Sequence, residues 1–333
     1  GAIVWGTETV ELALFVTAGP HGTVGRNPDS TNDLYAYGTE VEVTAYPDPG
    51  YAFLYWEGDV PTNASRYDNP IWVVVDQERT LRAVFASTAD GVYTWIGDGT
   101  NKLASNPANW YPNQAPTSGV HLVLDGTSVK EMYWDLDIEV GSWTQTEGYE
   151  AYYTPAEGYR GWVVFMTKYP GQGTFTNLHI RGDCTLLGGT WTHPANTGNT
   201  QQVDRLSISV GGNFFLASNA LIDVRNRGFD TFRGPGAGLS GQRSPTARGA
   251  SHGGMGNFQP GYATNAPTYG SVAHPMALGS GAADRGGGAV HLVILGTATV
   301  NGQILADAVG PNTMNDGASG GSIYLFCDSL SGT

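Results

Sequence analysis

Acidic, basic and imidazole side chains that could carry acid–base chemistry lie close together in the sequence between residues 223 and 252. Polysaccharide-degrading enzymes need a carboxylate or an imidazole that moves a proton, and lyases also need a charge-neutralising partner. The stretch offers both kinds of group, but it holds none of the three lysines of the chain. The candidate catalytic side chains are Asp223, Arg225, Arg227, Asp230 and His252.

No familiar catalytic pattern joins these residues. The sequence shows no phosphate-binding loop, no Ser–His–Asp motif and no metal-ligand spacing, so no cofactor and no metal are expected. Asp223 also recurs as Asp307 in an internal repeat, and a turn residue should recur where an active-site residue need not. We therefore expect these side chains to anchor turns and loops, and the isolated histidines elsewhere in the chain to be structural.

A second group of residues suits binding. Six aromatic residues crowd between positions 143 and 162, with Gly148, Pro155 and Gly158 among them. Aromatic rings stack on the C–H faces of sugars, and exposed aromatic patches commonly mark an interaction. The same rings could instead pack down and cap a β-helix, and the sequence leaves both alternatives open. The candidate ligand-binding aromatic residues are Trp143, Tyr149, Tyr152, Tyr153, Tyr159 and Trp162.

Arginines gather in residues 225–288, which hold six of them against two aspartates in a chain of formal charge −14. Arginine binds carboxylates and sulfates through paired hydrogen bonds, so this stretch could hold uronic or sulfated glycans. Alternatively, the arginines tie down loop carbonyls. The acidic surface of the whole chain would repel phosphates, so nucleic acid is not an expected partner. The candidate ligand-binding arginines are Arg225, Arg227 and Arg233.

The composition indicates which elements position these side chains. With 48 Gly and 18 Pro, about a fifth of the chain disfavours helix, because Gly costs about 1 kcal/mol and Pro about 3 kcal/mol in a helix interior. Disordered chains are poor in aromatic residues, whereas this chain has 9 Trp, 17 Tyr and 11 Phe. The sequence therefore predicts a folded, all-β protein. No apolar stretch approaches the roughly 20 residues of a membrane-spanning helix, so no membrane insertion is expected in this segment.

Residues 1–88 are predicted to form one small β-rich module. Residues 40–45 alternate polar and apolar side chains, as a half-buried strand does, and the Pro-Asp-Pro-Gly sequence at 47–50 is a turn signal. Trp56 and Phe53 are large enough to form the core of a domain of this size. The order of a Gly-Thr-Val turn, an alternating centre with a Gly-Tyr and a Trp, and a closing Ala-Val-Phe strand resembles the internalin B-repeat-like modules of bacterial surface proteins. The matching positions are 22–24, 38–45, 49–51, 53, 56, 58 and 83–85.

This resemblance implies a spacer or adhesive module and carries no catalytic residues. After a polar linker, residues 93–99 and 105–110 resemble the segment that precedes parallel β-helices in autotransporter-like and other Gly-rich bacterial exoproteins. The resemblance implies that a β-helix follows, and the alternative is a tryptophan-anchored loop.

An internal repeat supports the β-helix independently. Residues 206–224 align with residues 290–308 at a shift of 84, with apolar and Gly positions matched. At this shift Ala220 meets Ile304 and Asp223 meets Asp307. One strand–turn–strand unit cannot bury its apolar face alone, whereas stacked units can. The sequence thus predicts that residues 91–333 form a right-handed parallel β-helix, truncated at its C-terminal end, with 225–288 as a long Gly-rich insertion; a β-sandwich is the alternative.

On this basis 178–224 and 289–327 should stack as successive coils. Two cysteines, Cys184 and Cys327, are expected to be free thiols or, alternatively, a disulfide.

The whole sequence predicts a non-enzymatic structural or adhesive segment of a large bacterial cell-surface or secreted protein. The expected partners are extracellular glycans or other surface proteins. The alternatives are a polysaccharide lyase or hydrolase on a β-helix and a self-assembling filament or matrix subunit.

Overall fold

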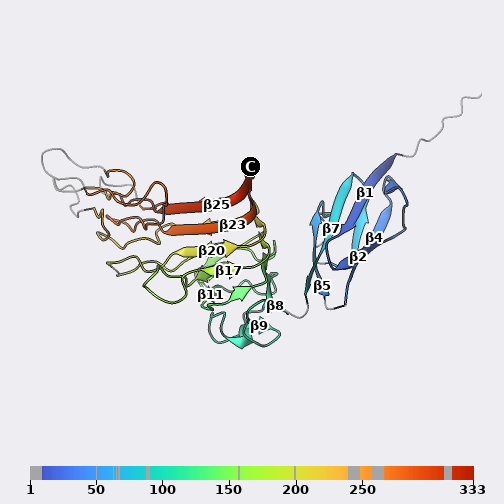
Figure 1. Ribbon diagram of the computed structural model, residues 1–333, viewed down its shortest axis with the longest axis horizontal. Coiled ribbons are helices and arrows are strands. Elements are labelled where there is room, and N and C mark those ends of the chain that lie inside the picture. Colours follow the sequence, from blue (N-terminus) through green and yellow to red (C-terminus); the bar gives the residue numbers. More distant parts are fainter. Residues whose placement is uncertain are drawn as a thin grey trace, which may run out of the picture. The chain divides into compact units, whose positions relative to one another are not determined.

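The computed structural model describes residues 10–49, 51–62, 64, 66, 68–87, 91–156, 158–198, 200–238, 248–256, 266–310 and 317–333. In this part of the chain the structure is all-β, and its one helical element is a three-residue 3-10 helix, η1 (Pro107–Asn109). The predicted fold class is confirmed. The chain divides into two compact units, residues 1–91 and residues 92–333 (Figure 1).

The N-terminal unit contains two small sheets. One has the strand order β3-β1-β7-β5, in which β1 and β7 run parallel and the other neighbours run antiparallel. The other is antiparallel, with the order β2-β4-β6. The strands are β1 (Glu11–Ala18), β2 (Gly22–Asn27), β3 (Leu34–Ala36), β4 (Glu40–Pro47), β5 (Tyr51–Gly58), β6 (Ile71–Val74) and β7 (Arg79–Ser87).

The core of this unit lies around Trp56. The predicted alternation along β4 holds, since Val41, Val43 and Ala45 are buried and the residues between them are not. Trp56 is completely buried, and its indole N–H donates a hydrogen bond to the Asp68 carbonyl oxygen at 2.9 Å. Phe53 is only partly buried but packs against Trp56, with 5.3 Å between the ring centroids.

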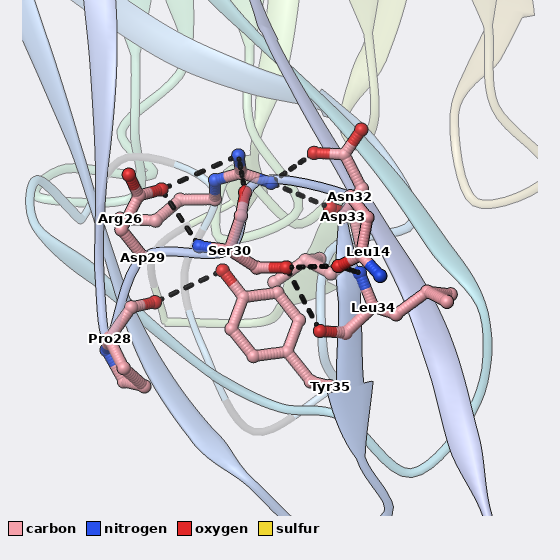
Figure 2. Close-up of polar contacts among 9 residues, drawn as sticks. All are labelled: Leu14, Arg26, Pro28, Asp29, Ser30, Asn32, Asp33, Leu34 and Tyr35. Carbon is pink, nitrogen blue, oxygen red and sulfur yellow. Dashed lines mark hydrogen bonds and ion pairs between the residues drawn. The ribbon is translucent and has the colours of Figure 1, made fainter.

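A single arginine holds the loop that follows β2 (Figure 2). The Arg26 guanidinium donates to the Leu14 carbonyl oxygen of β1 at 3.3 Å and to the Ser30 carbonyl oxygen at 2.9 Å, and it forms an ion pair with Asp33. The Tyr35 hydroxyl donates to the Pro28 carbonyl oxygen at 3.0 Å. These contacts fasten the acidic loop 28–33 to the neighbouring strand.

The C-terminal unit is a parallel β-helix with three stacks of strands. Strands of successive coils pair in parallel within each stack, and Figure 1 shows β17, β20, β23 and β25 side by side. The first stack is β8 (Val92–Trp95), β10 (His121–Leu124), β13 (Ser142–Gln145), β18 (Cys184–Leu186), β21 (Phe214–Leu216) and the second half of β23 (Ala289–Val300). The second is β11 (Met132–Trp134), β16 (Trp162–Phe165), β19 (Thr190–Thr192), β22 (Leu221–Asp223) and β24 (Gln303–Leu305). The third is β12 (Glu139–Val140), β17 (Leu178–Ile180), β20 (Leu206–Val210), the first half of β23, and β25 (Ser322–Ser331).

The predicted stacking of 178–224 on 289–327 is confirmed, because β20 pairs with β23 and β22 pairs with β24 across the long insertion. A parallel stack of this kind excludes the β-sandwich alternative for this unit. The predicted shift of 84 holds where Leu206 pairs with Val290. It is wrong in β22, where Asp223 pairs with Leu305, a shift of 82. The reason is the turn before the strand, which spans residues 217–220 in one coil but only 301–302 in the next.

Because of this change in register, two of the predicted matches between the repeats are wrong. Ile222, not Ala220, lies beside Ile304, and Asp223 and Asp307 do not occupy equivalent positions. Asp223 therefore does not recur at an equivalent position of the next coil, and the repeat does not support a turn role for this residue. Its contacts with Arg225 give that support instead.

Tryptophans form a continuous spine inside the coils. The rings are completely buried and contact one another edge to face, with centroid distances of 5.2 Å for Trp95–Trp110, 5.1 Å for Trp134–Trp143 and 5.7 Å for Trp143–Trp191. Trp110 belongs to β9 (Trp110–Tyr111), which pairs antiparallel with β8 at the first coil. Each such ring buries a large apolar area, so the spine contributes strongly to core stability.

One buried amide accepts hydrogen bonds from two indoles of the spine. The Gln145 side-chain oxygen accepts hydrogen bonds from the indole N–H groups of Trp143, at 3.1 Å, and Trp191. Its amide nitrogen donates to the Gly188 carbonyl oxygen at 3.0 Å. Burying these donors without a partner would cost free energy, so Gln145 determines how the two rings can pack.

The insertion is described for residues 225–238, 248–256 and 266–288. Its glycines let backbones approach closely: a Cβ atom on Gly286 would lie 2.0 Å from the Gly279 carbonyl oxygen. Phe229 and Leu278 are buried together with Ala289 and against Tyr169 of the coils. The insertion thus lies on the β-helix and shares a small apolar cluster with it.

Both cysteines are free thiols. Cys184 is buried in β18, and burial raises the pKa of its thiol well above the usual range. Cys327 is half-buried in β25.

Candidate ligand-binding site

A hairpin between β13 and β16 presents aromatic rings to solvent. It consists of β14 (Tyr152–Thr154) and β15 (Gly158–Arg160), and Tyr153 lies directly opposite Tyr159. Residues opposite each other in an antiparallel pair share one face, so the two rings meet, with centroids 5.1 Å apart. The Tyr159 ring in turn lies 4.7 Å from the ring of Trp162. We call Tyr153, Tyr159 and Trp162 the aromatic ladder.

The ladder is accessible. Tyr153 is 61% exposed and Tyr159 is 43% exposed, while Trp162 is half-buried at the start of β16. Three adjoining rings, two of them exposed, form an apolar surface on which the C–H groups of a sugar can stack.

The base of the hairpin is fixed by two residues. Tyr149 is completely buried, and its hydroxyl donates to the carbonyl oxygens of Lys130 and Trp162, at 3.3 and 3.4 Å. Burial raises the pKa of this phenol far above its usual range, so the group stays a neutral donor. Gly161 has φ +63°, and a Cβ atom there would lie 2.0 Å from the Glu150 carbonyl oxygen. The chain can therefore turn from the hairpin into β16 only with glycine at this position.

A cation lies at the inner end of the ladder. The guanidinium carbon of Arg227, from the insertion, is 6.0 Å from the centre of the Trp162 ring, which is a cation–π distance. Within the described ranges, no ion pair engages this guanidinium. Its N–H donors could therefore bind a carboxylate or sulfate on a ligand stacked along the rings.

The structure separates the predicted aromatic residues into two groups. Trp143 and Tyr149 are completely buried, so these two pack in the core and cannot stack on a ligand. Tyr153, Tyr159 and Trp162 form the ladder. Tyr152 is exposed, but it lies opposite Arg160 and alternation places it on the other face of the hairpin.

The three predicted ligand-binding arginines also lie in different surroundings. Arg225 forms two hydrogen bonds with the Asp223 carboxylate, at 3.0 and 2.7 Å, and so is engaged locally. Arg233 is exposed, and the described structure shows no contact between its side chain and the ladder. Arg227 is the arginine that adjoins the aromatic rings.

The five candidate catalytic side chains do not converge in the described structure. Asp223 is paired with Arg225, and Asp230 forms an ion pair with Arg285 at 3.1 Å. His252 lies elsewhere in the insertion, where its Nδ1 donates to the Gly320 carbonyl oxygen at 2.9 Å.

His252 and Tyr269 line a cavity of about 620 Å³. Its other described lining residues are Gly253, Gly254, Thr268, Gly270, Ser271, Val272, Pro275, Ser319, Gly320, Gly321 and Ser322. This lining brings no carboxylate or arginine beside the imidazole. In the described ranges no three His, Cys, Asp or Glu side chains are placed to hold a metal ion.

Two buried polar residues have structural roles in the coils; His193 is among the isolated histidines expected to be structural, whereas no sequence signal points to Gln145. Gln145 and His193 belong to no motif, and both are completely buried. His193 Nδ1 donates to the Pro194 carbonyl oxygen at 2.8 Å, and Nε2 accepts from the backbone N–H of Ala289 at 3.2 Å. His193 thereby ties β19 to the point where the chain returns from the insertion, which only the three-dimensional arrangement reveals.

Comparison with known proteins supports the interpretation of the N-terminal unit. Residues 12–89 match the family model of the divergent InlB B-repeat domain. The N-terminal unit is therefore similar to a bacterial repeat domain, as the sequence indicated. Neither a curated protein nor a solved structure matches the chain. The resemblance of residues 93–110 to autotransporter-like exoproteins stays a prediction.

The B-repeat match points to a module of a bacterial surface protein. Across the ranges that the structure describes, no helix has the length and apolar character needed to cross a membrane.

Proposed function

We propose that the chain is a non-enzymatic structural and adhesive segment of a bacterial cell-surface or secreted protein, and that its aromatic ladder contacts extracellular glycans. The B-repeat-like unit supports the surface location. The stacked coils supply a rigid support, because every strand of the β-helix core is bonded along the stack. Self-association and binding to other surface proteins are the alternative interactions of such a segment.

The observation that carries the proposal is the ladder with its cation. Sugar rings have apolar C–H faces that stack on tyrosine and tryptophan, and the ladder offers three adjoining rings. Arg227 adds a positive charge at the Trp162 end. This combination favours an acidic glycan, such as a uronate or sulfated polymer, over a neutral one.

The test is affinity electrophoresis of the full chain in gels that contain uronate, sulfated or neutral polysaccharides. We expect retardation of the wild type, at least about tenfold weaker binding in the double variant Trp162→Ala/Tyr153→Ala, and a loss for acidic polymers alone in Arg227→Gln. Tyr111→Ala is the matched control, since Tyr111 is 71% exposed but lies on β9, outside the ladder. Equal binding by the wild type and the double variant would overturn the proposal.

A further inference from the structure

The N-terminal unit has an exposed sheet face that combines aromatic and acidic side chains. Alternation along β4 directs Glu40, Glu42 and Tyr46 away from the core, and alternation along β6 does the same for Trp72 and Val74. Trp72 is 51% exposed and Tyr46 is 54% exposed. We call these five residues the acidic–aromatic face.

The register of the sheet places charge beside apolar surface. Glu42 lies directly opposite Trp72, and Glu40 lies directly opposite Val74. Opposite residues of an antiparallel pair have Cβ atoms about 4.5–5.5 Å apart, so the Glu42 and Trp72 side chains start side by side on one face. The two carboxylates are two residues apart on one strand, which separates them by about 7 Å.

Glu40 and Glu42 form no ion pair with a basic side chain in the described part of their unit. Residues 10–87 contain 11 acidic residues, four arginines and no lysine. Three of the arginines are engaged in ion pairs, Arg26 with Asp33, Arg79 with Asp76 and Arg82 with Glu57. No ion pair engages Glu40 or Glu42 within the part of the unit that the structure describes.

We propose that the acidic–aromatic face binds an extended, basic segment of a partner polypeptide, with Lys or Arg at alternate positions. In an extended chain alternate side chains recur about every 7 Å on one face, which matches the spacing of Glu40 and Glu42. One cation lies over the Trp72 ring beside Glu42, where the ring face and the carboxylate both attract it. The next Lys or Arg, two residues further along the partner segment, forms an ion pair with Glu40.

The chemistry of this face opposes that of the ladder. An acidic glycan, which suits Arg227, would be repelled by two uncompensated carboxylates. Exposed ion pairs contribute little each, so this contact is weak and sensitive to salt. The inference does not depend on glycan binding at the ladder.

The experiment measures the fluorescence anisotropy of a labelled peptide of alternating Arg and Thr, titrated with the full chain. A peptide of alternating Glu and Thr is the charge control. We expect the Arg–Thr peptide to bind and the Glu–Thr peptide not to bind. Affinity should fall at least about fivefold when NaCl rises from about 50 mM to about 300 mM.

Variants distinguish binding at this face from attraction by the net negative charge of the protein. Glu42→Gln and Trp72→Thr should each weaken binding at least about fivefold. Glu11→Gln and Phe15→Thr make the same changes at exposed positions of β1, in the other sheet, and should stay within about twofold of the wild type. Threonine is used because it suits a strand.

Absence of Arg–Thr binding would overturn the inference, as would equal losses in Glu42→Gln and Glu11→Gln, which would indicate attraction by net charge alone. Affinity electrophoresis on polysaccharides provides the separate readout for the ladder. Trp72→Thr should leave glycan retardation unchanged, and an unchanged fluorescence of the buried Trp56 in the same unit checks that the variant is folded.

Discussion

His193 gives the β-helix a dependence on acid that the structure specifies in sign and size. The imidazole is completely buried and neutral, with its proton on Nδ1 and its Nε2 accepting a backbone hydrogen bond from Ala289. Burial lowers the pKa of His193 to about 3; the hydrogen bond to Pro194 opposes this shift, and the positive charges of Arg227 and Lys168 add to it. Protonation would also destroy the acceptor that Ala289 needs.

The sign follows from comparison with the unfolded chain, in which the pKa of histidine is about 6.5. The unfolded state binds the proton first as the pH falls, so acid favours unfolding. The contribution of neutral His193 is fully present above about pH 6.5 and is lost progressively as the pH falls towards 3. At about 1.4 kcal/mol for each pH unit, the loss is about 2 kcal/mol at pH 5, a large share of the 5–15 kcal/mol typical of a domain.

The assay is guanidinium unfolding of the full chain followed by tryptophan fluorescence, at about pH 7 and pH 5. The matched variant is His193→Gln, whose amide can donate and accept but does not titrate. The difference in unfolding free energy between the wild type and the variant should shrink by about 2 kcal/mol from pH 7 to pH 5. Parallel pH dependences in the two proteins would refute the reasoning, as would an NMR titration that gives His193 an ordinary pKa.

Four further outcomes follow from the geometry. Gln145→Leu leaves two buried indole N–H groups without an acceptor, so denaturant unfolding should show a loss of about 2–4 kcal/mol, and an unchanged midpoint would contradict the role given to this amide. Arg26→Lys removes the fork that fastens the loop to β1, and faster amide exchange in residues 28–35, with no change in the β-helix, is the expected observation. Gly161→Ala forces the hairpin base to move and should weaken glycan retardation as strongly as the double ladder variant, which gel electrophoresis measures. Uronate-containing and sulfated glycans should not be turned over, as read by unsaturated-product absorbance and reducing ends; activity abolished by Asp230→Asn or His252→Ala would instead establish an enzyme.

The sequence predicts the sheets well where burial alternates or repeats. The polar–apolar alternation of β4 and the repeat of 206–216 in 290–300 both depend on side chains that face the core, and both correspond to observed pairing. The register of β22 could not be predicted, because the length of a solvent-exposed turn leaves no trace in the apolar pattern.

The sequence predicts only part of the candidate ligand-binding site. A cluster of aromatic residues indicates stacking or packing, and the choice for each ring depends on its place in the coil or the hairpin. Tyr149 and Tyr153 are four residues apart, yet one is completely buried and the other mostly exposed, since the hairpin begins between them. The contact of Arg227 with Trp162 joins a residue of the insertion to a residue of a coil, so no local sequence pattern predicts it.

Trp162 is the glycan contact on which the proposed function depends most directly. The decisive measurement is a titration of the full chain, labelled with nitrogen-15 in its tryptophan indoles, with an oligouronate. We predict that the Trp162 indole signal shifts in a saturable way, that the exposed Trp72 on the acidic–aromatic face does not, and that Arg227→Gln abolishes the shift. A saturable shift of Trp72 without one of Trp162, or no shift at either, would contradict the ladder as the binding site.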